Sequence, residues 1–295
     1  MTPEKSRTPA NGVDRSTCSP RSVVAVIIEI DDPDDPRLDD YCLLNDQAAR
    51  RTREGDEFFI AEGYVPIDRV VDSGHQLRSV LVTPSRVERI VERVPSLVDG
   101  VVPLYVMTRD LMKHAVGFDL HRGVVASAQR RPVPSVTDLA NSPAVRVAVL
   151  VGLNDAENVG VIARAARALH IDALLLDPTC TDAYSRRTIR VSMGEILHLP
   201  VARAHDWPGD LDVLHDAGFE SWAMTPTADA VDLWSSPPDA FPTRLAIVVG
   251  AEGPGLDDET MRATSRRVRI PIHHDVDSLN VGHAAAITFA ATTRP

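Results

Sequence analysis

The chain has 295 residues, which is enough for about two domains, and its 44% content of hydrophobic residues is ordinary for globular proteins with sizeable cores. A formal net charge of -11 argues against a protein that coats nucleic acid broadly. An aromatic content of 4% argues against a binder that works mainly by stacking bases on aromatic platforms.

Residues 1–35 are predicted to form a disordered or loosely ordered tail with one short apolar stretch, VVAVIIEI. The segment before this stretch is polar and lacks the apolar core of a secretory signal. The three cysteines are widely spaced and indicate no disulfide framework, which suits a reducing cytosol. Because no apolar run approaches the roughly 20 residues that span a bilayer, we expect a cytoplasmic protein.

Residues 36–130 are predicted to form a first, smaller domain in which strands and helices alternate. Apolar spacing favours helices at 41–53, 65–73 and 85–94, and apolar runs favour strands at 58–60 and 79–83. This alternation is typical of an α/β sandwich. Residues 131–143 contain three prolines and no periodicity, so we interpret them as a linker.

Residues 144–295 are predicted to form a second domain around a mostly parallel sheet with helices on both faces. The valine-rich run at 145–153 fits a central parallel strand that is covered on both sides. Further strands are expected at 172–177, 200–204, 219–224, 244–250 and 267–272. Helices are expected at 163–169, 183–193, around 211–214 and at 279–292.

Ligands of open parallel sheets bind beyond the carboxyl ends of the strands, so the residues after each strand are the candidates for a site. After the first strand of the second domain, Asn158 is placed to cap a helix and Gly160 permits close backbone approach. Arg164, on the next turn, could reach a phosphate or hydroxyl group. The alternative is an ordinary capped helix with a surface arginine.

After the fifth strand, three glycines and a proline between Gly250 and Gly255 force a tight turn that contains Glu252. Such turns often let a cofactor contact backbone amides. The sequence lacks both the GxGxxG dinucleotide pattern and the GxxxxGK[ST] phosphate-binding pattern, which argues against nicotinamide and ATP sites.

After the sixth strand, a polar loop leads into a helix of small residues. Ser278 and Asn280 in this loop can bond a ligand or cap the helix. The side chains of His273, His274, Asp275 and His283 are candidate metal ligands. We expect no metal site, because the HxxxH spacing is missing and adjacent histidines cannot easily share one ion.

Basic residues gather in four places despite the acidic total, and such patches either bind phosphate or are simply solvated faces. They are Arg50, Arg51 and Arg53; Arg130 and Arg131; Arg186, Arg187 and Arg190; and Arg266, Arg267 and Arg269.

Together, the three loop stretches resemble the signature motifs of the SpoU (TrmH) family of RNA methyltransferases, within the SPOUT class. The order and the spacing both match, and a looser resemblance, to the domain with which many members bind RNA, begins at Phe59. The matching residues are Asn158, Gly160 and Arg164; Gly250, Glu252, Gly253 and Gly255; and Ile270, Pro271, Ser278, Leu279, Asn280 and Val281. The chain departs from the family where Gly282 and His283 follow Val281.

The resemblance implies a C-terminal sheet with a trefoil knot, S-adenosyl-L-methionine as cofactor, an rRNA or tRNA substrate and a homodimer with the site near its interface. It implies cofactor contacts at Gly250, Ile270 and Leu279, and by extension at Val249, Gly255 and Pro271. It implies that Arg164 positions the ribose 2′-hydroxyl or its phosphate, from its own or a neighbouring subunit. Asn158, Ser278 and Asn280 would order the site, and Glu252 would brace the loops.

Two other functions fit the same residues. One is an RNA-binding protein that kept this fold and lost catalysis, and the other is a methyltransferase of the SPOUT class that modifies a base. The ribose reaction is favoured because the motifs resemble the ribose-modifying branch.

Overall fold

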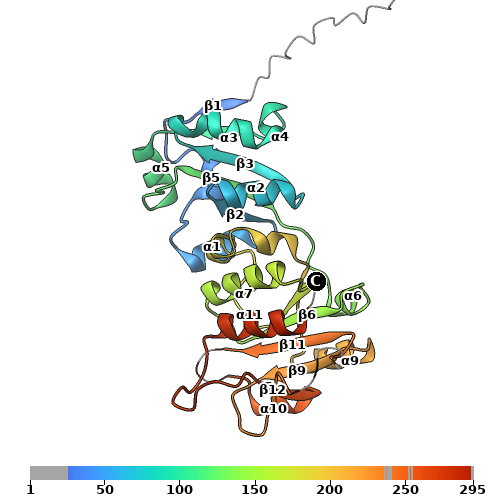
Figure 1. Cartoon of the computed structure of the whole chain (residues 1–295). Helices are drawn as coiled ribbons and strands as arrows, with labels where there is room; N and C mark the ends of the chain where they lie inside the picture. Colours follow the sequence, from blue (N-terminus) through green and yellow to red (C-terminus); the bar gives the residue numbers. More distant parts are fainter. Residues whose placement is uncertain (1–25, 236, 238–240, 252, 254, 294–295) are drawn as a thin grey trace, which may run out of the picture.

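The computed structural model describes residues 26–235, 237, 241–251, 253 and 255–293. It contains two sheets, each with its own helices, and the N-terminal unit lies above the C-terminal one in Figure 1. No helix in the described part of the chain is long and apolar enough to cross a membrane.

The N-terminal unit is built on a five-stranded mixed sheet with strand order β1-β4-β3-β5-β2. Its strands are β1 (Ile27–Glu29), β2 (Phe58–Glu62), β3 (Leu77–Val82), β4 (Leu104–Val106) and β5 (Val124–Gln129). Its helices are η1 (Pro36–Tyr41), α1 (Gln47–Glu54), α2 (Tyr64–Asp72), η2 (Pro84–Arg86), α3 (Val87–Arg93), α4 (Pro95–Val98) and α5 (Arg109–Val116).

This unit begins earlier than the sequence indicated. Ile27–Glu29 pair with β4 in parallel, and Ile30 is buried, so residues 27–30 of the predicted tail belong to the N-terminal sheet and its core. The helix expected at 41–53 begins only at Gln47, because Tyr41 ends η1 and Asp46 caps α1 by accepting a bond from the amide of Ala49.

The C-terminal unit is built on a seven-stranded sheet with strand order β10-β12-β9-β11-β6-β7-β8, in which every pairing is parallel. Its strands are β6 (Arg146–Val151), β7 (Ala173–Leu176), β8 (Val201–Arg203), β9 (Glu220–Met224), β10 (Val231–Asp232), β11 (Leu245–Gly250) and β12 (Arg266–Arg269). Its helices are α6 (Val136–Ala140), α7 (Ala156–Ala168), α8 (Arg186–Val191), η3 (Glu195–His198), α9 (Asp210–Asp216), α10 (Asp258–Ala263) and α11 (Val281–Thr292).

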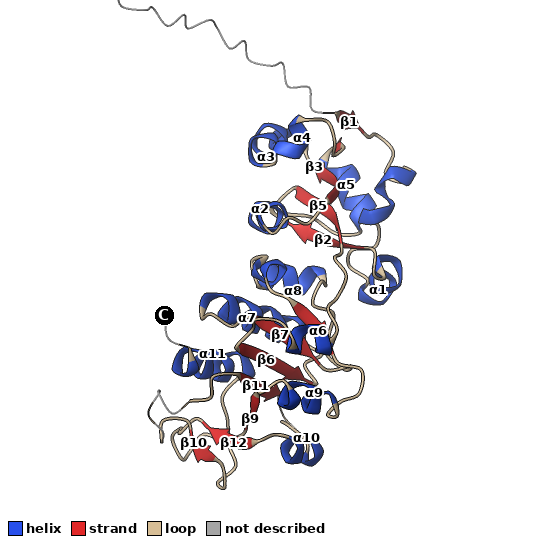
Figure 2. Cartoon of the chain, turned by 90° about the vertical axis from the view of Figure 1, so that its right-hand side faces the viewer, coloured by secondary structure: helices blue, strands red, loops and turns tan. Residues whose placement is uncertain are grey.

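Both faces of the parallel sheet are covered, as the valine-rich first strand predicted. Val147 and Val149 of β6 belong to the core with α6 and α9, whereas Ala148 and Leu150 belong to the core with α7 and α11. Figure 2 shows α7, α8 and α11 on one side of the sheet and α6, α9 and α10 on the other. The predicted α/β class with a parallel sheet is therefore confirmed.

The segment interpreted as a linker contains a helix. Ser135 and Asp138 form a reciprocal capping box that starts α6, and Val136 and Leu139 are buried against the parallel sheet. The sequence did not predict this helix, because its five residues are too few to show a helical period and three prolines lie near it. The residues between the two units thus pack on the C-terminal one.

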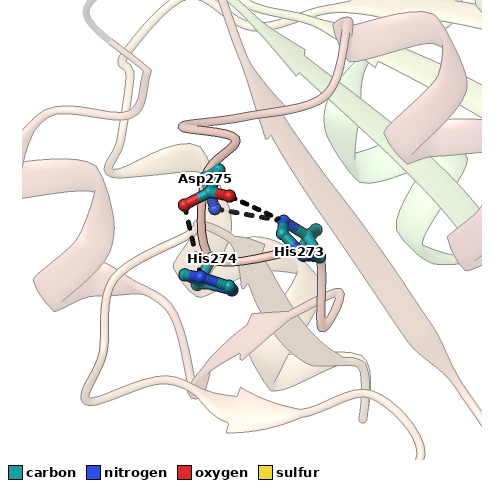
Figure 3. A group of neighbouring side chains, drawn as sticks. All are labelled: His273, His274 and Asp275. Carbon is teal, nitrogen blue, oxygen red and sulfur yellow. Dashed lines mark hydrogen bonds and ion pairs between the residues drawn. The ribbon is translucent and has the colours of Figure 1, made fainter.

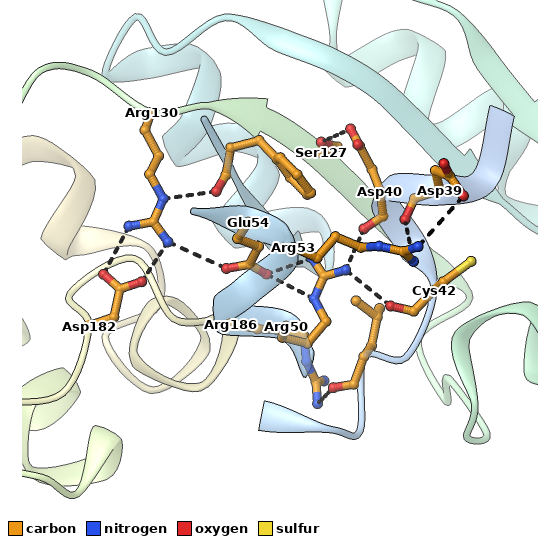
Figure 4. Close-up of polar contacts among 12 residues, drawn as sticks. Asp39, Asp40, Cys42, Arg50, Arg53, Glu54, Ser127, Arg130, Asp182 and Arg186 are labelled. Atoms are coloured by element: carbon orange, nitrogen blue, oxygen red, sulfur yellow. Dashed lines mark hydrogen bonds and ion pairs between the residues drawn. The ribbon is translucent and has the colours of Figure 1, made fainter. Parts of the chain in front are cut away.

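Polar and aromatic contacts join the two units, and Figure 4 shows the polar ones. Arg130, at the end of β5, donates to both carboxylate oxygens of Asp182 and to Glu54. His75 packs its ring against Phe59 and Tyr184, with ring centroids 5.4 and 6.0 Å apart. Burial lowers the pKa of His75 to about 4, so its ring is neutral near pH 7 and packs as an apolar group.

Candidate functional site

Three loops at the carboxyl ends of β9, β11 and β12 surround a cavity of about 570 Å³. Because these strands are parallel neighbours, their carboxyl ends lie at one edge of the sheet. Of the predicted cofactor-binding residues, Val249, Gly250, Gly255, Ile270 and Leu279 line this cavity. Residues far apart in the sequence therefore meet in one place.

The glycines of the β11 loop are required by its backbone. Gly253 and Gly255 have φ angles of 89° and 70°, and Ala251 and Gly255 form an antiparallel bridge that closes the turn. A Cβ atom on Gly250 would lie 2.6 Å from the carbonyl carbon of Gly255 and 2.7 Å from the amide nitrogen of Leu256. Only glycine fits there without displacing backbone. Glu252 and Pro254 lie outside the described residues.

The third loop contributes Ile270, Ile272 and Ser278 to the cavity. Pro271, predicted as a cofactor residue, is not among the cavity-lining residues, although it stands between two residues that are. Residues 270–272 were expected to continue the sixth strand, but β12 ends at Arg269.

Asn280 connects the third loop to the first motif. Its side-chain oxygen accepts bonds from the amides of Gly282 and His283 and so caps α11. Its Nδ2 donates to Oδ1 of Asn158 over 3.3 Å. Asn158 itself does not cap α7, because Asp155 accepts the bond from the amide of Glu157 and starts the helix three residues earlier than predicted.

Glycines let α7 pack closely on its neighbours. A Cβ on Gly160 would lie 2.8 Å from Cβ of Val191, and a Cβ on Gly282 would lie 2.8 Å from a methyl carbon of Val161. Gly282, one of the departures from the family pattern, thus permits the close contact between α7 and α11. Arg164 lies on the exposed side of α7 and is not among the residues that line the cavity.

A second, larger depression of about 1060 Å³ adjoins the first one. The two share Ala251, Gly255 and Leu256, and Asn158 lines the second depression. Five carboxylates also line it, those of Asp155, Asp177, Asp206, Asp257 and Asp258. This acidic depression favours neutral or cationic groups over phosphates.

His273, His274 and Asp275 lie together on the exposed part of the third loop (Figure 3). The carboxylate of Asp275 is 3.6 Å from Nδ1 of His273 and 3.2 Å from Nε2 of His274. Their nitrogen and oxygen atoms are close enough to share an ion, but no other described His, Cys, Asp or Glu belongs to the group, and His283 is not part of it. The expectation that the chain uses no metal stays a prediction.

One wall of the cavity was not predicted from the sequence, and it is formed by Met224, Thr225, Pro226 and Thr227. Met224 ends β9 and the other three residues directly follow it, at the carboxyl end of a parallel strand where ligands bind. The segment has few glycines or charges, and for this reason the sequence alone did not single it out.

The profile of the SpoU rRNA Methylase family matches residues 146–290, which include all three motifs. A Mycobacterium bovis protein described as an uncharacterized tRNA/rRNA methyltransferase is 42% identical over 267 residues, covering 90% of this chain and 91% of that protein. The 23S rRNA (guanosine(2553)-2′-O)-methyltransferase RlmP of Bacillus subtilis is 25% identical over 222 residues, covering 74% and 85%.

Among solved structures, the S-adenosylmethionine-bound rRNA methyltransferase of Sinorhizobium meliloti superposes with a TM-score of 0.74. It is 25% identical in sequence, and the match covers 90% of this chain and 97% of that one. The similarity therefore includes both units of the fold.

Proposed function

The chain belongs to the SpoU rRNA Methylase family, and on this premise we propose that it transfers a methyl group from S-adenosylmethionine to a ribose 2′-hydroxyl of rRNA or tRNA in the cytoplasm. The observation that carries the proposal is the meeting of all three motifs: two of them line one cavity, and the hydrogen bond from Asn280 to Asn158 joins the first motif to it. The ribose target is supported by RlmP, whose name specifies 2′-O-methylation.

The cavity suits the adenosine part of S-adenosylmethionine. Its volume is within the range of about 300–1,000 Å³ typical of small-molecule sites. Val249, Ile270 and Leu279 offer apolar surface, and Ser278, Thr225 and Thr227 offer hydroxyl groups. Gly250 and Gly255 bring bare backbone to the wall, where amides and carbonyls can bond the adenine and ribose. Pro271 fixes the backbone between two lining residues.

The methyl carbon of the bound sulfonium is already activated, so the protein's task is to align the 2′-hydroxyl with it. Arg164 binds the hydroxyl or the adjacent phosphate through its planar guanidinium. Asn158 and Asn280 hold the starts of α7 and α11 together, and Ser278 and Glu252 order the loops around the acceptor. An arginine is a poor proton acceptor because its pKa is far above 7, so its role is positioning.

The active form is proposed to be a homodimer that buries the outer sides of α7 and α11. Helix α11, VGHAAAITFAAT, is apolar almost all round, a pattern typical of helices that are covered on every side. Yet His283 and Ala290 are exposed, and Val161 of α7, which lies against Gly282, is 43% exposed. Arg164 lies on the same exposed side of α7 as Val161, so a dimer would bring it near a cofactor site.

We expect Val161→Asp to weaken dimerisation at least about tenfold, because an unpaired buried carboxylate costs more than about 1.4 kcal/mol. Sedimentation equilibrium measures the dissociation constant. The control is Val101→Asp, at an exposed position between α4 and β4. A monomeric wild-type protein, or a Val161→Asp dimer as tight as that of the control, would contradict the dimer proposal.

The N-terminal unit is proposed to bind the RNA substrate, and the C-terminal sheet is proposed to be knotted. The first proposal requires that a chain lacking residues 1–130 bind RNA more weakly than the whole protein. The second requires that an electron-density map trace one loop through another.

Titration calorimetry with S-adenosylmethionine tests the proposed function first. Binding is expected, and its absence would favour an RNA-binding protein that has lost catalysis. If the cofactor binds and the methyl group is recovered on a base, the enzyme is a base methyltransferase and the ribose assignment is wrong.

A further inference from the structure

A groove of about 350 Å³ runs between the two units, and both of its walls carry arginines. One wall comes from the N-terminal unit and carries Asn45 and Arg51. The other wall comes from the C-terminal unit and carries Asn154, Arg186 and Arg187, at the starts of α7 and α8. Four arginines of the described chain line this groove, since Arg50 also belongs to it.

Most carboxylates on the walls of the groove are already paired with arginines (Figure 4). Glu54 accepts a bond from Arg50 over 2.5 Å and from Arg130 over 3.4 Å. The side chains of all three residues are buried between the two units. Asp182 is paired with Arg130. The negative charges of the walls are therefore largely neutralised inside the protein, and they do not repel a phosphate strongly.

Two arginines face the groove with donors to spare. Arg51 is exposed, and its guanidinium makes no hydrogen bond or ion pair with any residue in the described ranges. Arg187 is paired with Glu157, and both side chains of this pair are about half exposed, so solvent weakens the pairing. A guanidinium with free N–H groups matches the geometry of a phosphate.

The groove is continuous with the proposed active site. Asn154 and Asp155 line both the groove and the acidic depression, and the depression shares Ala251 and Gly255 with the cofactor cavity. The acidic depression repels phosphates, and the groove offers them free arginines. A strand lying along this path would therefore place its charged backbone in the groove and its uncharged nucleoside parts nearer the cofactor.

From this arrangement we infer that the groove holds the backbone of the RNA substrate next to the target nucleotide, with phosphates on Arg51 and Arg187. Helix α1 of the N-terminal unit is then part of the substrate site. Among the described residues, no aromatic side chain lines the groove to stack a base, so the contacts are to phosphate and independent of sequence. This inference rests on the proposed function, since it takes RNA to be the substrate.

The test measures binding of a fluorescein-labelled poly-uridine RNA to the full chain by fluorescence anisotropy, over a series of KCl concentrations. The RNA has about 20 nucleotides, which exceeds the site of a typical single-strand binding fold. Arg51→Ala is expected to weaken binding about tenfold, the contribution of one hydrogen-bonded phosphate contact. The slope of log K against log [KCl] should fall by about 0.7 for each phosphate of a single strand that the variant no longer neutralises. Arg51→Lys should keep most of the salt slope, because it keeps the charge.

The matched control is Arg89→Ala, an arginine on the exposed side of α3, away from the groove. S-adenosylmethionine binding should be the same in all variants. Arg51→Ala with the affinity and salt slope of Arg89→Ala would overturn the inference, as would a wild-type protein that does not bind this RNA. If the wild type methylates RNA while Arg51→Ala behaves as the control, the groove is not the RNA site and the proposed enzymatic function stands. If the wild type binds RNA through Arg51 but transfers no methyl group, the groove inference stands and the proposed enzymatic function is wrong.

Discussion

Arg164→Ala is expected to lower the rate of methyl transfer at least about a hundredfold, because a misplaced acceptor loses the benefit of alignment. The affinity for S-adenosylmethionine should not change, since Arg164 does not line the cofactor cavity. Calorimetry measures the affinity, and transfer of a tritiated methyl group to RNA measures the rate. A lower rate with an unchanged affinity separates acceptor positioning from cofactor binding.

The control for Arg164 is Arg167→Ala, because Arg167 is also an exposed arginine on α7 and lies about one turn further along. It should transfer methyl groups at the wild-type rate. Arg164→Lys should recover only part of the activity, since an ammonium group lacks the planar fork of donors. Wild-type activity in Arg164→Ala would remove this residue from the mechanism.

Gly250→Ala is expected to weaken S-adenosylmethionine binding about tenfold to a hundredfold, because overpacking costs about 1–3 kcal/mol and falls here on the cofactor wall. The added Cβ would lie 2.6–2.8 Å from backbone atoms of Gly255 and Leu256, which cannot rotate away as a side chain can. The β11 loop must then move outward and change the cavity. Calorimetry gives the affinity, and thermal unfolding shows whether the domain still folds.

Gly218→Ala is the matched control for Gly250→Ala. Gly218 has a φ angle of 85° and nothing within 4 Å of a Cβ, and it precedes β9 at the opposite end of the same sheet. This substitution should lower the stability of the domain and leave cofactor affinity unchanged. An equal decrease of affinity in both variants would mean that the effect comes from general destabilisation, and the assignment of the cavity would be wrong.

The parallel sheet could be predicted well from the sequence because its central strands are buried on both faces. The run at 145–153 contains β6, and the run at 244–250 contains β11. Strands that are buried on both faces appear in a sequence as continuous apolar runs, which are easy to recognise. Shorter elements were missed. Strand β4 has three residues, and α10 has six, so neither is long enough to show a periodic pattern.

The site could be predicted only as far as its separate loops. The contact between Asn158 and Asn280 depends on β11 lying between β9 and β6, and strand order is not encoded in local periodicity. The resemblance to a family implied only that Asn158 and Asn280 order the same site. The sequence marked the arginine clusters at 50–53 and 186–190 as possible phosphate-binding patches, but it did not indicate that they meet in one groove. The relative placement of the two units is set by buried pairs such as Arg130 with Asp182.

The central claim is that this chain methylates a ribose of rRNA or tRNA, and mapping of 2′-O-methyl groups in RNA from cells with and without the gene tests it most directly. We expect one 2′-O-methylated nucleotide to disappear from the map of cells without the gene. The wild-type protein should restore it, and Arg164→Ala should not. Identical maps from both cells would contradict the claim.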